Sequence, residues 1–139
     1  MHMKRAIPAL PVKHMKESVK FYKNQLGFTV VFQEEGFAVL ACNTVHLHLW
    51  LAGDESWRKR EHAAPVVSGA ESYIAGTASC RIEVCGINEW YERMKPQGIL
   101  HPNAHIRNQW WGEREFGVTD PDNNLITFFE IIAENSEEK

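Results

Sequence analysis

The strongest constraint on the fold is that one order of secondary structure is written twice along the chain. Apolar spacing in residues 7–51 predicts a strand, a helix and then three strands, and residues 79–132 repeat that order. Short similar segments accompany the repeat: FYKNQLGF corresponds to YERMKPQGI, and FAVL corresponds to FGVT. An internal repeat of this length indicates a duplicated structural unit. We therefore expect an α+β protein that is built from two βαβββ modules.

The repeat also sets the expected domain organisation of the 139 residues. We place the first module at residues 5–52 and the second at residues 77–133, together in a single domain 1–139. The intervening residues 53–76 are polar and rich in small residues, which favours a linker and a loop. The acidic tail 134–139 is expected to fray.

In the first module, prolines at positions 8 and 11 favour an edge strand or an arm, because proline cannot donate to a strand ladder. The expected elements are the strand Ile7–Val12, the helix Lys16–Leu26 ended by Gly27, and the strands Phe28–Phe32, Phe37–Ala41 and Val45–Leu51. The second module should contain the strand Cys80–Val84, the helix Ile87–Lys95, a weakly written strand within Ile99–Arg107, and the strands Glu115–Thr119 and Leu125–Ile132.

Alternation along the strands assigns side chains to two faces of each sheet. In Val45–Leu51 one face is aliphatic and should pack on the helix, so His46, His48 and Trp50 are expected on the opposite, concave face. In the last strand Ile126 and Phe128 should pack on the helix. The concave side then receives Leu125, Thr127 and Phe129.

Composition excludes several classes of function. The net charge of -3, with no basic patch, argues against nucleic acid as a partner. Three cysteines without a C-x-x-C pair favour reduced thiols in a cytoplasmic protein over a disulfide framework or a zinc site. No apolar run is long enough to cross a bilayer, so we expect no membrane association. No phosphate-binding loop, dinucleotide fingerprint or G-x-S-x-G motif is present.

Three stretches resemble a known family: AIPALPVKHMKESVKFYKNQLGF, FQEEGFAVLACNTVHLHL and WWGEREFGVTDPDNN. They are similar to the vicinal-oxygen-chelate superfamily and, within it, most of all to the bleomycin resistance proteins, over most of residues 5–130. The resemblance implies two modules that form a curved mixed sheet around a concave groove. A proline at the place of Pro8 accompanies, in that family, an N-terminal arm that is exchanged between the subunits of a dimer.

Enzymes of the superfamily hold a divalent metal with His and Glu side chains, and the resemblance allows these positions to be compared. The metal-ligand places fall on Ile7, His48, Ser79 and Thr127. Only His48 carries a suitable donor, and one imidazole does not make a tight site. We therefore expect no metal and no cofactor, with His48 as the one weak candidate ligand.

Aromatic residues are the candidates for ligand binding. The resemblance places Trp111–Gly112 along the wall of the drug groove and Phe32 and Phe37 around it, while His48 and Trp50 follow from strand alternation. The alternative for each aromatic ring is a place in the core, and neighbouring Trp110 and Trp111 should point to opposite sides of an extended segment.

Acidic residues form two further groups that are either solvated or attract a cationic ligand near the groove mouth. These groups are Glu34, Glu35, Asp54 and Glu55, and Glu113 and Glu115.

The favoured hypothesis is a dimer that binds and sequesters a bleomycin-type glycopeptide antibiotic without turnover. The first alternative is a metal-dependent enzyme of the same superfamily, of the glyoxalase, dioxygenase, lyase or thiol transferase type, with His46 or Glu130 as additional ligands. The second alternative is a binding module for another small aromatic ligand.

Overall fold

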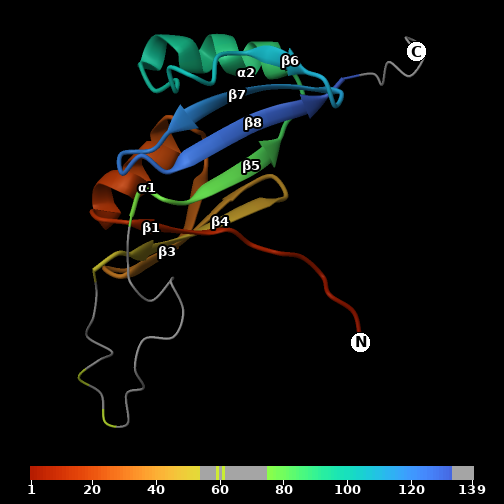
Figure 1. Cartoon of the computed structure of the whole chain (residues 1–139). Helices are drawn as coiled ribbons and strands as arrows, with labels where there is room; N and C mark the ends of the chain where they lie inside the picture. Colours follow the sequence, from red (N-terminus) through yellow and green to blue (C-terminus); the bar gives the residue numbers. More distant parts are fainter. Residues whose placement is uncertain (54–58, 60, 62–74, 133–139) are drawn as a thin grey trace. The chain divides into compact units, whose positions relative to one another are not determined.

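The computed structural model describes residues 1–53, 59, 61 and 75–132 (Figure 1). The chain divides into two compact units, Met1–Ala78 and Ser79–Lys139. Most of the expected linker, the tail 134–139, and Asp54 and Glu55 lie outside the described residues. In the part described, no helix is both long and apolar enough to cross a membrane.

The first unit is a βαβββ module, as predicted. Its elements are β1 (Ala9–Val12), α1 (Met15–Asn24), β2 (Thr29–Gln33), β3 (Phe37–Cys42) and β4 (Val45–Leu51). They form a four-stranded sheet in the order β1-β4-β3-β2, which we call sheet A. β1 runs parallel to β4 at one edge, and the other pairs are antiparallel. This edge position is the one that the prolines predicted.

Helix α1 covers one face of sheet A and forms the core of the first unit. Its apolar stripe is buried together with alternate residues of the strands, among them Leu47 and Leu49, which are fully buried. The helix ends at Asn24, two residues before the predicted end, and Gly27 follows with a φ of 87°. Glycine adopts this left-handed conformation without strain, so it turns the chain into β2.

A β-bulge in β2 changes the direction of Phe32. Val30 lies opposite Leu40, which faces α1, whereas Phe32 lies opposite Val39 on the other face. In a regular strand Val30 and Phe32 would share a face. The extra residue, Val31, breaks that alternation and turns Phe32 away from the helix.

The second unit repeats the module. Its elements are β5 (Ser79–Glu83), α2 (Ile87–Met94), the short 3-10 helix Lys95–Gln97, β6 (Arg107–Gln109), β7 (Glu113–Thr119) and β8 (Leu125–Ile131). They form a four-stranded sheet in the order β5-β8-β7-β6, which we call sheet B. Trp90 of α2 stacks on Phe128 at 5.4 Å, and both Ile126 and Phe128 are buried, as alternation predicted.

The outer edge of sheet B differs from the prediction. The weak strand expected within Ile99–Arg107 is reduced to one isolated bridge between Leu100 and Val118, and regular pairing resumes only in β6. Pro102 interrupts this edge, and the chain rejoins β7 where Gly117 donates its N–H to the Ala104 carbonyl at 2.8 Å. A strand that is broken in this way has too few alternating residues to be found from its sequence.

Candidate functional site

Four of the predicted site residues lie together on the face of sheet A opposite α1, which we call the helix-free face. Phe37 is opposite Trp50 across β3 and β4, and Val39 links Phe32 on one side with His48 on the other. The rings of Phe37 and His48 meet edge to face at 5.1 Å. Three neighbouring strands thus present aromatic rings and an imidazole on one surface.

These aromatic rings are not core residues. Phe32 is 49% exposed, and Phe37, His48 and Trp50 are all partly exposed. The buried positions of the same strands are aliphatic and face α1. The alternative of a core role for Phe32 and Phe37 is therefore wrong, and their rings are available for contact.

The remaining predicted residues, Trp110, Trp111 and Gly112, form the turn between β6 and β7 in the second unit. Gly112 has a φ of 92° and donates its N–H to the Gln109 carbonyl at 3.1 Å, which closes the turn. The two indole rings meet at right angles with centroids 5.5 Å apart. They do not point to opposite sides of an extended segment, because the segment is a turn. Trp110 is 91% exposed and Trp111 46%, so neither ring belongs to the core.

A charged cluster adjoins Trp111 on the face of sheet B opposite α2. We call Arg81, Gln109, Glu113 and Glu115 the Arg81 cluster. Arg81 Nη2 donates to Glu113 Oε1 at 2.5 Å and lies 3.0 Å from Glu115 Oε1, a charge contact without hydrogen-bond geometry. Gln109 donates to Glu115 Oε2 at 3.3 Å, and the Trp111 indole N–H donates to Glu113 Oε1 at 2.8 Å. Two carboxylates thus share one guanidinium, which leaves an excess of one negative charge.

The sequence interpretation included Glu113 and Glu115 but missed Arg81 and Gln109. A signal for Arg81 was present, since it alternates with the apolar Cys80 and Ile82 and so belongs to the face of Thr127. Gln109 carried no such signal, because it lies in the short strand at the irregular edge.

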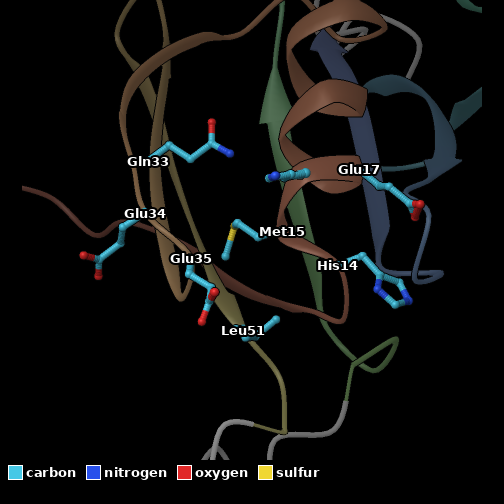
Figure 2. Close-up of a pocket in the computed structure, with 8 residues that line it drawn as sticks. His14, Met15, Glu17, Gln33, Glu34, Glu35 and Leu51 are labelled. Atoms are coloured by element: carbon cyan, nitrogen blue, oxygen red, sulfur yellow. The ribbon is translucent and has the colours of Figure 1, made fainter.

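The other acidic group occupies a different place. Glu34 and Glu35 line an open hollow of about 720 Å³ beside the start of α1, together with Met15 and Glu17. Figure 2 shows Met15 reaching from the helix toward the β2–β3 connection. The backbone N–H of Glu34 donates to the Phe37 carbonyl at 2.8 Å, so Glu34 also lies beside the aromatic end of β3. The side chains of Glu34 and Glu35 are exposed, as expected for a solvated turn.

The strand partners of the candidate metal positions are also unsuitable as ligands. Ala9 is opposite His48 and Arg81 is opposite Thr127, and neither side chain is a ligand for a divalent cation. Within residues 1–53, 59, 61 and 75–132, no three His, Cys, Asp or Glu side chains are grouped so that they could hold a metal ion.

Glu130, the other suggested ligand, has a structural role. Its carboxylate accepts hydrogen bonds from the backbone N–H groups of Ile87 at 3.0 Å and Gly86 at 3.1 Å, at the start of α2. These two bonds stabilise the ionised form and lower the pKa of Glu130. The side chain thus caps a helix whose own N-cap residue, Gly86, has no side chain to do so.

Comparison with known proteins identifies the family. Residues 4–128 match the model of the Glyoxalase/Bleomycin resistance protein/Dioxygenase superfamily. A bleomycin resistance protein from Geobacillus stearothermophilus is 62% identical over 130 residues, which cover 94% of this chain and 98% of the relative.

Solved structures share the fold at lower identity. A bleomycin-binding protein from bleomycin-producing Streptomyces verticillus, complexed with copper(II)-bleomycin, has a TM-score of 0.69 at 21% identity, covering 96% of this chain and 99% of that one. A lactoylglutathione lyase from Agrobacterium tumefaciens has a TM-score of 0.72 at 17% identity, covering 93% and 95%. The fold is therefore common to a binding protein and an enzyme, and sequence identity decides between the branches. The chain belongs to the glyoxalase/bleomycin resistance protein/dioxygenase superfamily and, within it, to the bleomycin resistance proteins.

Proposed function

We propose that this protein binds a bleomycin-type glycopeptide antibiotic and sequesters it, so that resistance follows from occupancy and not from turnover. The observation that carries the proposal is the 62% identity to a bleomycin resistance protein over 94% of the chain. Similarity of fold alone does not support the proposal, because a lyase shares the fold.

The aromatic surfaces are the proposed contacts for the drug. Planar heteroaromatic rings of the ligand would stack on exposed aromatic side chains, each contact being worth about 0.5–1.5 kcal/mol beyond area burial. In the first unit the proposed contacts are Phe32, Phe37, His48 and Trp50, and in the second unit Trp110, Trp111 and Gly112. Their partial exposure supports this assignment, because buried rings could not reach a ligand.

The charge of the Arg81 cluster supports a cationic ligand. Glu113 and Glu115 share a single guanidinium, so a second cation near them would find favourable electrostatic interactions. Both carboxylates are only partly exposed, with side chains 20% and 18% accessible, and the field that they produce is screened less than that of a fully solvated pair.

We further propose that the protein works as a cytoplasmic homodimer with exchanged N-terminal arms. Residues 1–7 have no regular structure and extend away from sheet A (Figure 1). Such a segment is available to pair with a second copy of the chain. The three cysteines are all free thiols, as a reducing compartment would keep them.

Protection of plasmid DNA from iron-bleomycin tests the proposal, because it separates sequestration from chemical inactivation. With the drug at a fixed concentration well above Kd, protection should rise linearly with protein and become complete at one chain per drug molecule. Longer preincubation should change nothing, and denaturing the protein should release intact bleomycin. Protection by far less than one chain per drug that grows with time would instead establish an enzyme.

A further inference from the structure

We propose that Arg81 is a positioning residue which, through Glu113, holds the Trp111 indole in a fixed orientation before any ligand arrives. The consequence for affinity rests on the proposed function, whereas the ordering of the ring does not. Neither Arg81 nor Glu113 was a predicted contact for the drug's aromatic rings. Their connection follows from the hydrogen bonds around one carboxylate oxygen.

The two bonds on Glu113 form a continuous chain from the sheet to the indole. Glu113 Oε1 accepts from the Trp111 indole N–H at 2.8 Å and from Arg81 Nη2 at 2.5 Å. The 2.8 Å bond from the indole is typical for a charged acceptor, and the bond from Arg81 joins two opposite charges. The carboxylate therefore has one position that satisfies both donors. Rotation of Glu113 would break the ion pair as well as the bond to the ring.

Arg81 is itself held from two further sides. Its guanidinium carbon lies 4.7 Å from the centroid of the Phe129 ring, and Nη2 lies 3.0 Å from Glu115 Oε1. Glu115 is fixed in turn by Gln109 at 3.3 Å. Together with Phe129, the Arg81 cluster therefore draws on all four strands of sheet B. The orientation of the indole is thus fixed by side chains of the sheet and not by the turn that carries Trp111.

Trp110 provides an internal comparison, because it occupies the same turn. Its ring is 91% exposed and contacts Trp111 edge to face. Within the part of the chain that the structure describes, its indole N–H has no hydrogen-bond acceptor. Two neighbouring tryptophans thus differ in whether the sheet anchors them, and only Trp111 is prepared to present a fixed ring face.

Anchoring matters because a half-exposed side chain loses rotamer freedom when a ligand stacks on it. If the ring is already ordered, that loss has occurred during folding and no longer weakens binding. Releasing one such side chain should weaken binding between about two- and tenfold. The electrostatic effect has the opposite sign, because removing Arg81 makes the surface more negative and more attractive to a cation. A weaker affinity in an Arg81 variant would therefore reveal positioning and not charge.

The test combines nuclear relaxation of the indole groups with bleomycin affinity. The five tryptophans give five indole ¹H–¹⁵N signals, and Trp111→Phe identifies the relevant one. Arg81→Met should lower the order parameter of the Trp111 indole in the ligand-free protein while that of Trp110 stays unchanged. Arg81→Lys should restore part of the order, because it keeps a cation beside Glu113.

Arg114→Met is the matched control. It removes the same charge from the residue next to Glu113, but Arg114 bonds Asn88 and Asn108 and does not bond Trp111. An unchanged Trp111 order parameter in Arg81→Met would overturn the inference. A loss of order with a bleomycin affinity no weaker than that of Arg114→Met would overturn its consequence for binding. If the wild-type protein does not bind bleomycin at all, the proposed function fails, and the relaxation data still decide whether Arg81 positions the ring.

Discussion

Trp111 is the residue whose possible roles differ most in their measurable consequences. Its ring is 46% exposed, so Trp111→Ala should leave the denaturation midpoint almost unchanged. Bleomycin affinity should fall by about 1–3 kcal/mol, or roughly ten- to a hundredfold in Kd, the range for an aromatic hot spot. Trp111→Phe should recover part of the loss, because a π-face remains.

Calorimetric titration and chemical denaturation of the same two variants measure both quantities. A core tryptophan would instead lose about 3–5 kcal/mol of folding stability on truncation to alanine. A large drop in stability with unchanged affinity per folded molecule would show that Trp111 is structural and that the ligand binds elsewhere.

Strand alternation was sufficient to place some site residues and not others. His48 and Trp50 were assigned correctly to the helix-free face, because β4 is regular and its other face is aliphatic. Phe32 reaches that face only through the bulge at Val31, which alternation does not encode. The Arg81 cluster depends on contacts of Arg81 with residues far away in the chain, such as Glu113, which is 32 positions distant. Such contacts follow from tertiary structure and have no local signal.

At the level of elements, the connection between β8 and α2 predicts a dependence of stability on pH. Two backbone hydrogen bonds, from Ile87 and Gly86, lower the pKa of Glu130 below its ordinary value of 4.5. A carboxyl whose pKa is lower in the folded state stabilises the protein above the unfolded pKa, and this contribution is lost as pH falls through the folded pKa. Glu130→Gln should therefore unfold at a lower temperature than wild type at pH 7.

Thermal unfolding between pH 7 and pH 3 checks this prediction. The difference between wild type and Glu130→Gln should be constant above about pH 5 and should shrink below pH 4.5, as the wild-type carboxyl becomes protonated. Glu92→Gln removes the same charge from an exposed position on α2 and serves as the control. A gap that stays equally wide at pH 3 would mean that the charge on Glu130 does not stabilise the helix.

The predictability of whole elements followed the regularity of their patterns. Both helices and the strands β3, β4, β7 and β8 were placed within two residues of their bounds, because each has a strong apolar period and a clear turn beside it. The edge of sheet B was not, since Pro102 and the turn after it divide the pairing into one bridge and a three-residue strand. The sequence of an edge segment that is held mainly by its neighbouring strand has little apolar alternation from which the strand could be predicted.

At the scale of the whole molecule, the proposed dimer predicts a mass in solution of twice the 16.0 kDa chain. Deletion of residues 1–7 should weaken the dimer and drug binding together, because in the proposed dimer the arm would help to build the interface in which the ligand binds. This deletion leaves β1 intact and keeps Pro8, whose carbonyl accepts from the His48 N–H at 3.0 Å. It therefore spares Leu10, which is buried in the core.

Light scattering at micromolar concentration, with and without the arm, measures the mass directly. Circular dichroism of the truncated chain controls for misfolding. A wild-type monomer that binds bleomycin with full affinity would disprove the dimeric site.

Titration of bleomycin into the wild-type protein, followed by tryptophan emission, tests sequestration most directly. Free N-acetyltryptophanamide, titrated in parallel, corrects for absorption of light by the drug. If the drug stacks on Trp111, emission should change to a plateau that is reached at one bleomycin per chain, with a Kd in the micromolar range or tighter. An emission that follows the free-tryptophan control up to millimolar bleomycin, with no plateau, would contradict the proposed function of this protein.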